Sequence, residues 1–211
     1  MSLEAFIFPP SPYSQALLFF MEDAKIDYLK KVINLRISEN DTNEYKKINP
    51  TLKTPAIKDG SFAIGETTAI LRYLSEKNEW AYYPKELQQR AHVDFWLEFI
   101  AQNIVPFSRE LIWQRHLFPA FGKQVSKDLE ARADKTLSRN LAIISDQLLK
   151  SDFICGQEIS LADFLLTPAL NWHASAKIEI SQFPSLDDWL NRMISRSSWA
   201  TVEITLKEFS V

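Results

Sequence analysis

Three hydroxyl side chains, Ser11, Tyr13 and Ser14, stand at the start of the first apolar stretch with helical spacing. A hydroxyl at a helix start can accept a hydrogen bond from a free backbone N–H and so cap the helix. It can also donate a hydrogen bond to an anion, which the positive end of the helix dipole attracts. The residues alone therefore leave two roles open, a helix cap and a group that stabilises a reactive anion.

The other side chains that often carry chemistry form no pattern of this kind. The three histidines, His92, His116 and His173, lack the spacing of metal ligands, so we expect no metal site. Cys155 is the single cysteine of the sequence and cannot form an intrachain disulfide, which favours a reducing cytoplasm. The sequence contains no glycine-rich phosphate loop.

The composition is typical of a globular protein that binds neither membranes nor nucleic acids. Apolar residues make up 46% of the chain and charged residues 24%. No apolar run approaches the roughly 20 residues that cross a bilayer, and the N-terminus lacks the pattern of a secretory signal. The net charge of −3 leaves no basic excess that would attract a phosphate backbone.

The first half of the sequence predicts an α/β domain. Apolar runs that end at prolines, polar turns and an Asp59-Gly60 dipeptide, which favours a tight hairpin, set the order βαβ, α, ββα. The expected elements are a strand at 3–8, a helix at 14–24, a strand at 30–34, a helix at 41–48, two short strands within 54–64 and a helix at 66–77.

The second half predicts helices almost throughout, from residue 86 onward. Pro106 should kink or interrupt the helix that contains "VDFWLEFIAQNIVPF". In "ISLADFLL", Ser160 and Asp163 occupy the N-cap and N3 positions of a capping box, which we interpret as structural. We therefore expect an α/β domain at 1–78 and an all-α domain at 86–211, joined by a linker at 79–85.

Several segments, taken together, resemble a known family. "NPTLKTPAIKDGSFAIGETTAILRYLSEK", "ISLADF" and "FPSLDDWLNRM" are similar to segments of the cytosolic glutathione transferases. "YYPKELQQRAHVD" and "LIWQRHLFPAF" most resemble the theta-like, serine-type members. The resemblance covers essentially the whole chain. It implies a thioredoxin-like domain followed by an all-helical domain, and a cytoplasmic homodimer that uses glutathione as co-substrate without another cofactor.

The resemblance also implies a glutathione site in the first domain. Pro55 would follow a cis peptide bond, so that the backbone of Thr54 could pair with the cysteinyl part of glutathione. Glu66 and Thr67, at a helix start, would hold the ammonium and the carboxylate of the γ-glutamyl end. Helix capping is the alternative role for this pair. Two further residues are expected at the glycyl carboxylate, Lys53 and Asn40.

The family places its thiol-activating group at or just after the first strand, and Ser11 lines up with the serine-type position. Ser14 and Tyr13 remain as alternatives. Phenylalanines stand where tyrosine-type members carry their tyrosine, and the sequence has no cysteine at the helix mouth, which argues against a cysteine-type thiol reductase.

The expected activity is glutathione transfer, in which the thiolate attacks an apolar electrophile or reduces an organic hydroperoxide. Phe107 and Trp113 are expected to line an apolar pocket for this second substrate. The alternative is a transferase-fold module that serves dimerisation or ligand carriage without catalysis. The combination of Ser11, Glu66 and Thr67 argues against that alternative.

Overall fold

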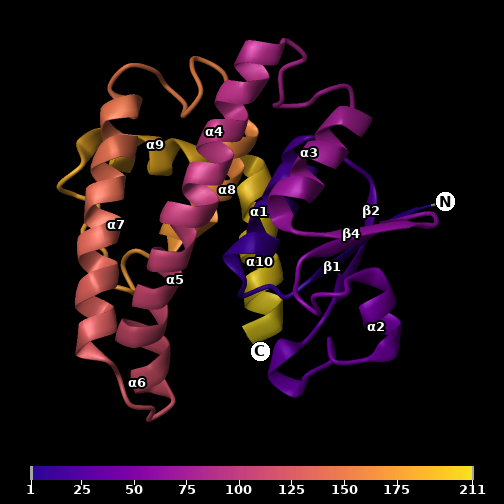
Figure 1. Cartoon of the computed structure of the whole chain (residues 1–211), viewed down its shortest axis with the longest axis horizontal. Helices are drawn as coiled ribbons and strands as arrows, with labels where there is room; N and C mark the ends of the chain where they lie inside the picture. Colours follow the sequence, from indigo (N-terminus) through magenta and orange to yellow (C-terminus); the bar gives the residue numbers. More distant parts are fainter. Residues whose placement is uncertain (1, 211) are drawn as a thin grey trace. The chain divides into compact units, whose positions relative to one another are not determined.

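The structure is a computed structural model that describes residues 2–210, and the chain divides into two compact units (Figure 1). The first unit combines Met1–Lys85 with Arg196–Val211, and the second is Glu86–Ser195. None of the helices within residues 2–210 is long and apolar enough to cross a membrane.

The first unit is built on a four-stranded mixed sheet with the strand order β2-β1-β3-β4. β1 and β2 run parallel, whereas β3 is antiparallel to both of its neighbours. This arrangement confirms the predicted thioredoxin-like order βαβ, α, ββα. The elements are β1 (Leu3–Ile7), α1 (Pro12–Asp23), β2 (Tyr28–Val32), η1 (Leu35–Ile37), α2 (Asn43–Ile48), β3 (Ala56–Asp59), β4 (Phe62–Gly65) and α3 (Thr67–Lys77).

The predicted position of the second strand was wrong by two residues. We expected a strand at 30–34, but β2 begins at Tyr28, which pairs with Leu3 at the start of β1. The sequence pattern also missed η1, a single turn capped by Asn34, whose side chain accepts a hydrogen bond from the Arg36 N–H at 3.0 Å. Local polar contacts of this kind decide element ends more than apolar spacing does.

The core of the first unit surrounds α1. Its residues from Ser14 to Met21 are all buried, so this helix is covered on every side. Figure 1 shows α10 (Ser197–Ser210) beside α1, and the rings of Phe19 and Trp199 meet edge to face at 5.1 Å. The Arg196 guanidinium donates to both carboxylate oxygens of Asp23, at 2.8 and 2.9 Å.

The expected division into domains at 1–78 and 86–211 remains a proposal, and the compact units differ from it in one respect. The linker region is irregular, since α3 ends at Lys77 and α4 begins at Leu87. The C-terminal helix, however, packs against α1 and therefore belongs to the first compact unit.

The second unit is helical. As predicted, the helix is interrupted next to Pro106. α4 ends at Asn103, and α5 begins at Val105 with this proline in its first turn. A π-helical turn, η2, follows α5 directly. The elements are α4 (Leu87–Asn103), α5 (Val105–Ile112), η2 (Trp113–Leu117), α6 (Phe118–Ala120), α7 (Lys127–Leu148), α8 (Leu161–Asn171) and α9 (Pro184–Ile194).

The predicted capping box at the start of α8 is confirmed. One carboxylate oxygen of Asp163 accepts hydrogen bonds from the N–H and the hydroxyl of Ser160, both at 2.8 Å. The other accepts from the Ile154 N–H at 3.0 Å and from the Trp189 indole N–H at 2.9 Å. Burial raises the pKa of Asp163, and these four donors oppose the shift. Asp163 thus ties α8 to the preceding loop and to α9.

Candidate functional site

The loop between β1 and α1 carries the candidate catalytic hydroxyl. Ser11 is the N-cap residue of α1, and Pro12 occupies the first helical position. The Ser11 N–H donates to the Phe8 carbonyl at 2.8 Å. The Ser11 side chain makes no capping hydrogen bond, although it stands at the position where serine usually makes one. Its hydroxyl is therefore not used for capping.

The two alternative hydroxyls lie in different surroundings. Ser14 is fully buried, and its Oγ accepts a hydrogen bond from the Phe8 N–H at 3.1 Å. The neighbouring Gln15 is also buried, and its Nε2 donates to the Pro9 carbonyl at 2.9 Å. Tyr13 is half-buried in the first turn of α1. Of the two serines, Ser11 is the more accessible.

The peptide bond between Thr54 and Pro55 is cis, as predicted. Pro55 is buried, and β3 begins at the next residue, Ala56, so Thr54 lies just outside the strand ladder. The Thr54 Oγ1 is a buried atom without a hydrogen-bond partner among residues 2–210. The segment before β3 therefore presents a backbone stretch that the sheet does not use.

The start of α3 holds the predicted pair Glu66 and Thr67. Thr67 is the first helical residue and is 5% exposed. Glu66 is the N-cap residue, but its exposed side chain makes no capping hydrogen bond, contrary to the alternative role considered for it. Its backbone has φ 63° and ψ 111°, which non-glycine residues rarely adopt. Conformations of this kind cluster at ligand-binding sites.

Asn49 connects the turn before β3 to the end of β4. Its Nδ2 donates to the Lys53 carbonyl at 2.8 Å, and its Oδ1 accepts from both the N–H and the hydroxyl of Thr51. A Cβ atom at Gly65 would lie 2.6 Å from Asn49 Nδ2, so a larger residue there would have to displace the Asn49 amide. This contact fixes the turn at Lys53 relative to Glu66. Sequence reasoning missed it, because Asn49 before a proline indicates only the end of a helix.

The two residues expected at the glycyl carboxylate also lie on this turn or against it. The Lys53 side chain is exposed. The Asn40 Nδ2 donates to the Leu52 carbonyl at 2.7 Å, which uses one of its two amide hydrogens. Asn40 thus supports the backbone next to Lys53, and its second amide hydrogen has no partner within residues 2–210.

The two residues expected to contact the second substrate lie in the second unit. Phe107 is half-buried in α5, and Trp113, at the first position of η2, is 37% exposed. The Trp113 ring packs against Phe118 with a centroid distance of 5.3 Å. Phe118 was not anticipated from the sequence. It is brought beside Trp113 by the wider π-helical turn that separates them.

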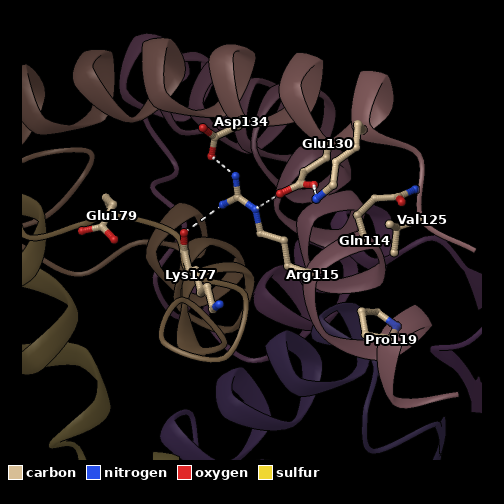
Figure 2. A pocket seen from close by; sticks show the side chains of 9 residues that line it. Gln114, Arg115, Pro119, Val125, Glu130, Asp134, Lys177 and Glu179 are labelled. Atoms are coloured by element: carbon tan, nitrogen blue, oxygen red, sulfur yellow. Dashed lines mark hydrogen bonds and ion pairs between the residues drawn. The ribbon is translucent and has the colours of Figure 1, made fainter. Parts of the chain in front are cut away.

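The second unit also contains a polar cavity of about 450 Å³ in which no predicted site residue lies (Figure 2). The Arg115 side chain extends across it to Glu130 and Asp134, at 2.9 Å each, and donates to the Lys177 carbonyl at 2.8 Å. The Lys127 ammonium and the Arg115 guanidinium hold the pKa of Glu130 below its usual range. The charges that line this cavity are largely paired with one another.

Within residues 2–210, no group of three or more His, Cys, Asp or Glu side chains has an arrangement that could hold a metal ion. The first unit instead carries the Ser11 hydroxyl at a helix start, a backbone segment before the cis-proline Pro55, and the pair Glu66 and Thr67 at a second helix start. A thioredoxin-like unit with these features, followed in the chain by a helical unit, is the architecture that the resemblance to glutathione transferases implies.

Comparison with known proteins agrees with this class. Residues 10–77 match the family model "Glutathione S-transferase, N-terminal domain", and residues 108–197 match "Glutathione S-transferase, C-terminal domain". Glutathione S-transferase theta-3 of Mus musculus is 32% identical over 200 residues, which are 92% of this chain and 82% of the mouse protein. The chain belongs to the glutathione S-transferase family, and the predicted theta-like resemblance is confirmed.

Solved structures show the same fold. Human glutathione transferase theta-2, in complex with glutathione and an unknown ligand, has a TM-score of 0.88 and 28% identity. The match covers 97% of this chain and 87% of the human one. Glutathione transferase F2 of Populus trichocarpa has a TM-score of 0.90 at 23% identity and covers 98% of this chain and 99% of its own. At 23% identity, the likeness to the Populus trichocarpa structure shows the fold alone.

Proposed function

We propose that this protein binds glutathione in its first unit, ionises the thiol and transfers the glutathionyl group to an apolar electrophile. The observation that carries the proposal is the Ser11 hydroxyl at the N-cap of α1, which is not used for capping. A thiolate at this position would meet both a hydroxyl donor and the positive end of the helix dipole. Membership of the transferase family supports catalysis over a non-catalytic carrier.

In this proposal each part of glutathione has its own partners. The Thr54 backbone pairs with the cysteinyl part beside Pro55, as an added strand would. The exposed Glu66 carboxylate pairs with the γ-glutamyl ammonium, and Thr67 holds the α-carboxylate at the start of α3. Lys53 and the remaining amide hydrogen of Asn40 reach the glycyl carboxylate. The proton of the thiol leaves to solvent, and no further cofactor takes part.

The second substrate is an apolar electrophile or an organic hydroperoxide, contacted by Phe107 and Trp113. The thiolate sulfur forms a bond to the electrophilic carbon while the leaving group departs with its electron pair. With a hydroperoxide, the sulfur instead attacks the terminal peroxide oxygen and an alcohol leaves. A second glutathione then converts the sulfenic acid to a disulfide and releases water, so the two thiols supply both electrons.

We further propose a cytoplasmic homodimer. On α4, Leu87 is 68% exposed and Phe95 is 59% exposed, and the Phe95 and Phe99 rings stack at 6.4 Å. Exposed aromatic side chains of this kind favour contact with another protein surface. Light scattering after size exclusion measures the mass directly, and a monomer at micromolar concentration would contradict the homodimer.

The proposed function is tested by glutathione binding of the Glu66→Ala variant. We expect the wild type to be retained on immobilised glutathione and eluted by free glutathione. The variant should lose about 1.5–3 kcal/mol of binding free energy, the usual range for a hydrogen bond to a charged group, measured by titration calorimetry.

Glu76→Ala is the matched control, because Glu76 is also exposed and lies on the same helix. It should bind glutathione as the wild type does. A wild-type protein that fails to bind millimolar glutathione, and that conjugates none of a panel of electrophiles, would favour the non-catalytic module instead.

A further inference from the structure

The loop from Phe8 to Ser11 has few backbone groups with which to hold its shape. Pro9 and Pro10 lack an N–H, so Phe8 and Ser11 supply the only two backbone donors of these four residues. The Ser11 N–H donates to the Phe8 carbonyl within the loop, whereas the Phe8 N–H donates to Ser14 Oγ. The conformation of the loop therefore depends on a side chain of α1.

A second side chain of α1 holds the same loop. Gln15 Nε2 donates to the Pro9 carbonyl at 2.9 Å. Ser14 is 0% exposed and Gln15 is 1% exposed, so water cannot replace either contact without a rearrangement. A buried backbone group that loses its partner is costly, and the loop would shift to regain one.

Ser11 itself has no side-chain bond to the helix that would fix its place. Its position is therefore set by the loop backbone, which Ser14 and Gln15 hold. We propose that Ser14 is a positioning residue that acts through Ser11, with Gln15 as its partner in holding the loop. This inference rests on the proposed function, in which the Ser11 hydroxyl donates to the glutathione thiolate.

The consequence for the reaction is specific. A hydrogen bond weakens steeply as its length and angle depart from the optimum, so a displaced Ser11 stabilises the thiolate less. The contacts to the two ends of glutathione lie in other segments, at Lys53 and at Glu66. Loss of the Ser14 hydroxyl should therefore raise the pKa of bound glutathione and leave its affinity nearly unchanged.

The test is a double-mutant cycle of Ser11→Ala and Ser14→Ala, read by the pKa of the bound glutathione thiol and by the pH profile of kcat/KM. Ser14→Ala should raise that pKa by about 0.5–1 unit, which from a wild-type value of ~6.5 is roughly a 2- to 5-fold loss in thiolate at pH 6.5. The loss should recover at higher pH. In the Ser11→Ala background, Ser14→Ala should change the rate less than about twofold.

Ser75→Ala is the matched control. Ser75 is likewise a fully buried serine of the first unit, and its hydroxyl donates to the Ala81 carbonyl at 2.6 Å, away from the loop. It should affect stability without moving the thiol pKa. If Ser14→Ala does not fold, Gln15→Met removes the other tie and should shift the pH profile in the same direction.

The outcomes separate the inference from the proposed function. An unchanged pH profile in both Ser14→Ala and Gln15→Met would overturn the inference while leaving the proposed function intact. The same would follow if the rate loss persisted in the Ser11→Ala background. A larger loss in Ser14→Ala than in Ser11→Ala would make Ser14 the activating group. A wild type that binds glutathione without lowering its thiol pKa would overturn both.

Discussion

At the scale of single residues, the energy needed to ionise glutathione decides what Ser11 has to supply. A free thiol has a pKa near 8.5, so only about 1% is ionised at pH 6.5. Lowering the pKa to ~6.5 requires roughly 2.7 kcal/mol. A hydrogen bond to the anion offers about 1.5–3 kcal/mol, and the helix N-terminus about 0.3–1 kcal/mol. The helix alone is too weak, so the hydroxyl is needed.

The Ser11→Ala variant should therefore lose about 10- to 100-fold in kcat/KM at pH 6.5, since its thiolate stabilisation falls by the hydrogen-bond term. The affinity for glutathione should stay nearly the same. A rise in pH should recover part of the loss, because solvent then ionises the thiol. Steady-state kinetics from pH 6 to 9 measure both effects.

Ser61→Ala serves as the control for this variant, because Ser61 is an exposed serine in the turn between β3 and β4. It should keep the wild-type profile. Full activity of Ser11→Ala at pH 6.5 would show that Ser11 does not activate the thiol.

The roles of residues that belong to a short sequence motif were predictable. The roles of residues that contact distant segments of the chain were not. The N-cap position of Ser11 follows from a short motif, whereas the cis bond before Pro55 was predicted from the family resemblance. The contact between Asn49 and Gly65 joins segments that are apart in sequence, and the left-handed backbone of Glu66 has no marker in the residue type itself. Such features depend on tertiary packing, which a short stretch of the sequence does not reveal.

At the scale of elements, the start of α8 shows how a capping box becomes part of the core. Ser160→Ala should cost about 0.5–2 kcal/mol of unfolding free energy, the usual range for the loss of an N-cap. Asp163→Ala should cost about 3 kcal/mol or more, because at least two buried donors, on Ile154 and Trp189, lose their acceptor at about 1–3 kcal/mol each.

Denaturant unfolding measures both values. Glutathione affinity of the folded protein should be unchanged in each variant, since the segment is expected to be structural. A large change in affinity at unchanged stability would contradict that reading.

The order and type of the elements were predictable from the sequence, whereas their ends were less so. Short apolar runs and the Asp59-Gly60 turn marked every strand of the sheet, and the proline at position 106 marked the interruption before α5. Pairing with β1, which a single segment cannot reveal, decided that β2 begins at Tyr28. The side chain of Thr42 accepts from the Tyr45 N–H and so starts α2 at Asn43 instead of Asp41.

At the scale of the whole molecule, Asp23 holds α10 in the first unit. Burial raises the pKa of this carboxyl, but hydrogen bonds from Arg196, Ser198 and Tyr82 outweigh that effect and hold it below its ordinary value. A carboxyl with a lowered folded pKa contributes stability that is present above its unfolded pKa, near 4. The contribution is lost as the pH falls through the folded pKa.

Asp23→Asn should therefore lower the unfolding free energy by about 1–3 kcal/mol at pH 7. The difference from the wild type should begin to shrink below about pH 4, where the unfolded carboxyl takes up a proton, and should be lost once the pH is below the lowered folded pKa. Denaturant unfolding at both pH values measures the difference, and hydrogen exchange locates it in α10. The exposed Asp27, mutated to Asn, is the control. A difference that does not depend on pH would rule out the charge of Asp23 as its cause.

The packing of α10 against α1 also orders events while the protein is being made. A ribosome adds about 5–20 residues per second, and the entire second unit is translated between α3 and α10. Throughout that interval the Phe19 ring lacks its packing partner, because Trp199 has not yet been synthesised. The thioredoxin-like unit therefore emerges first from the ribosome but completes its core last, and its nascent form offers the uncovered side of α1 to chaperones.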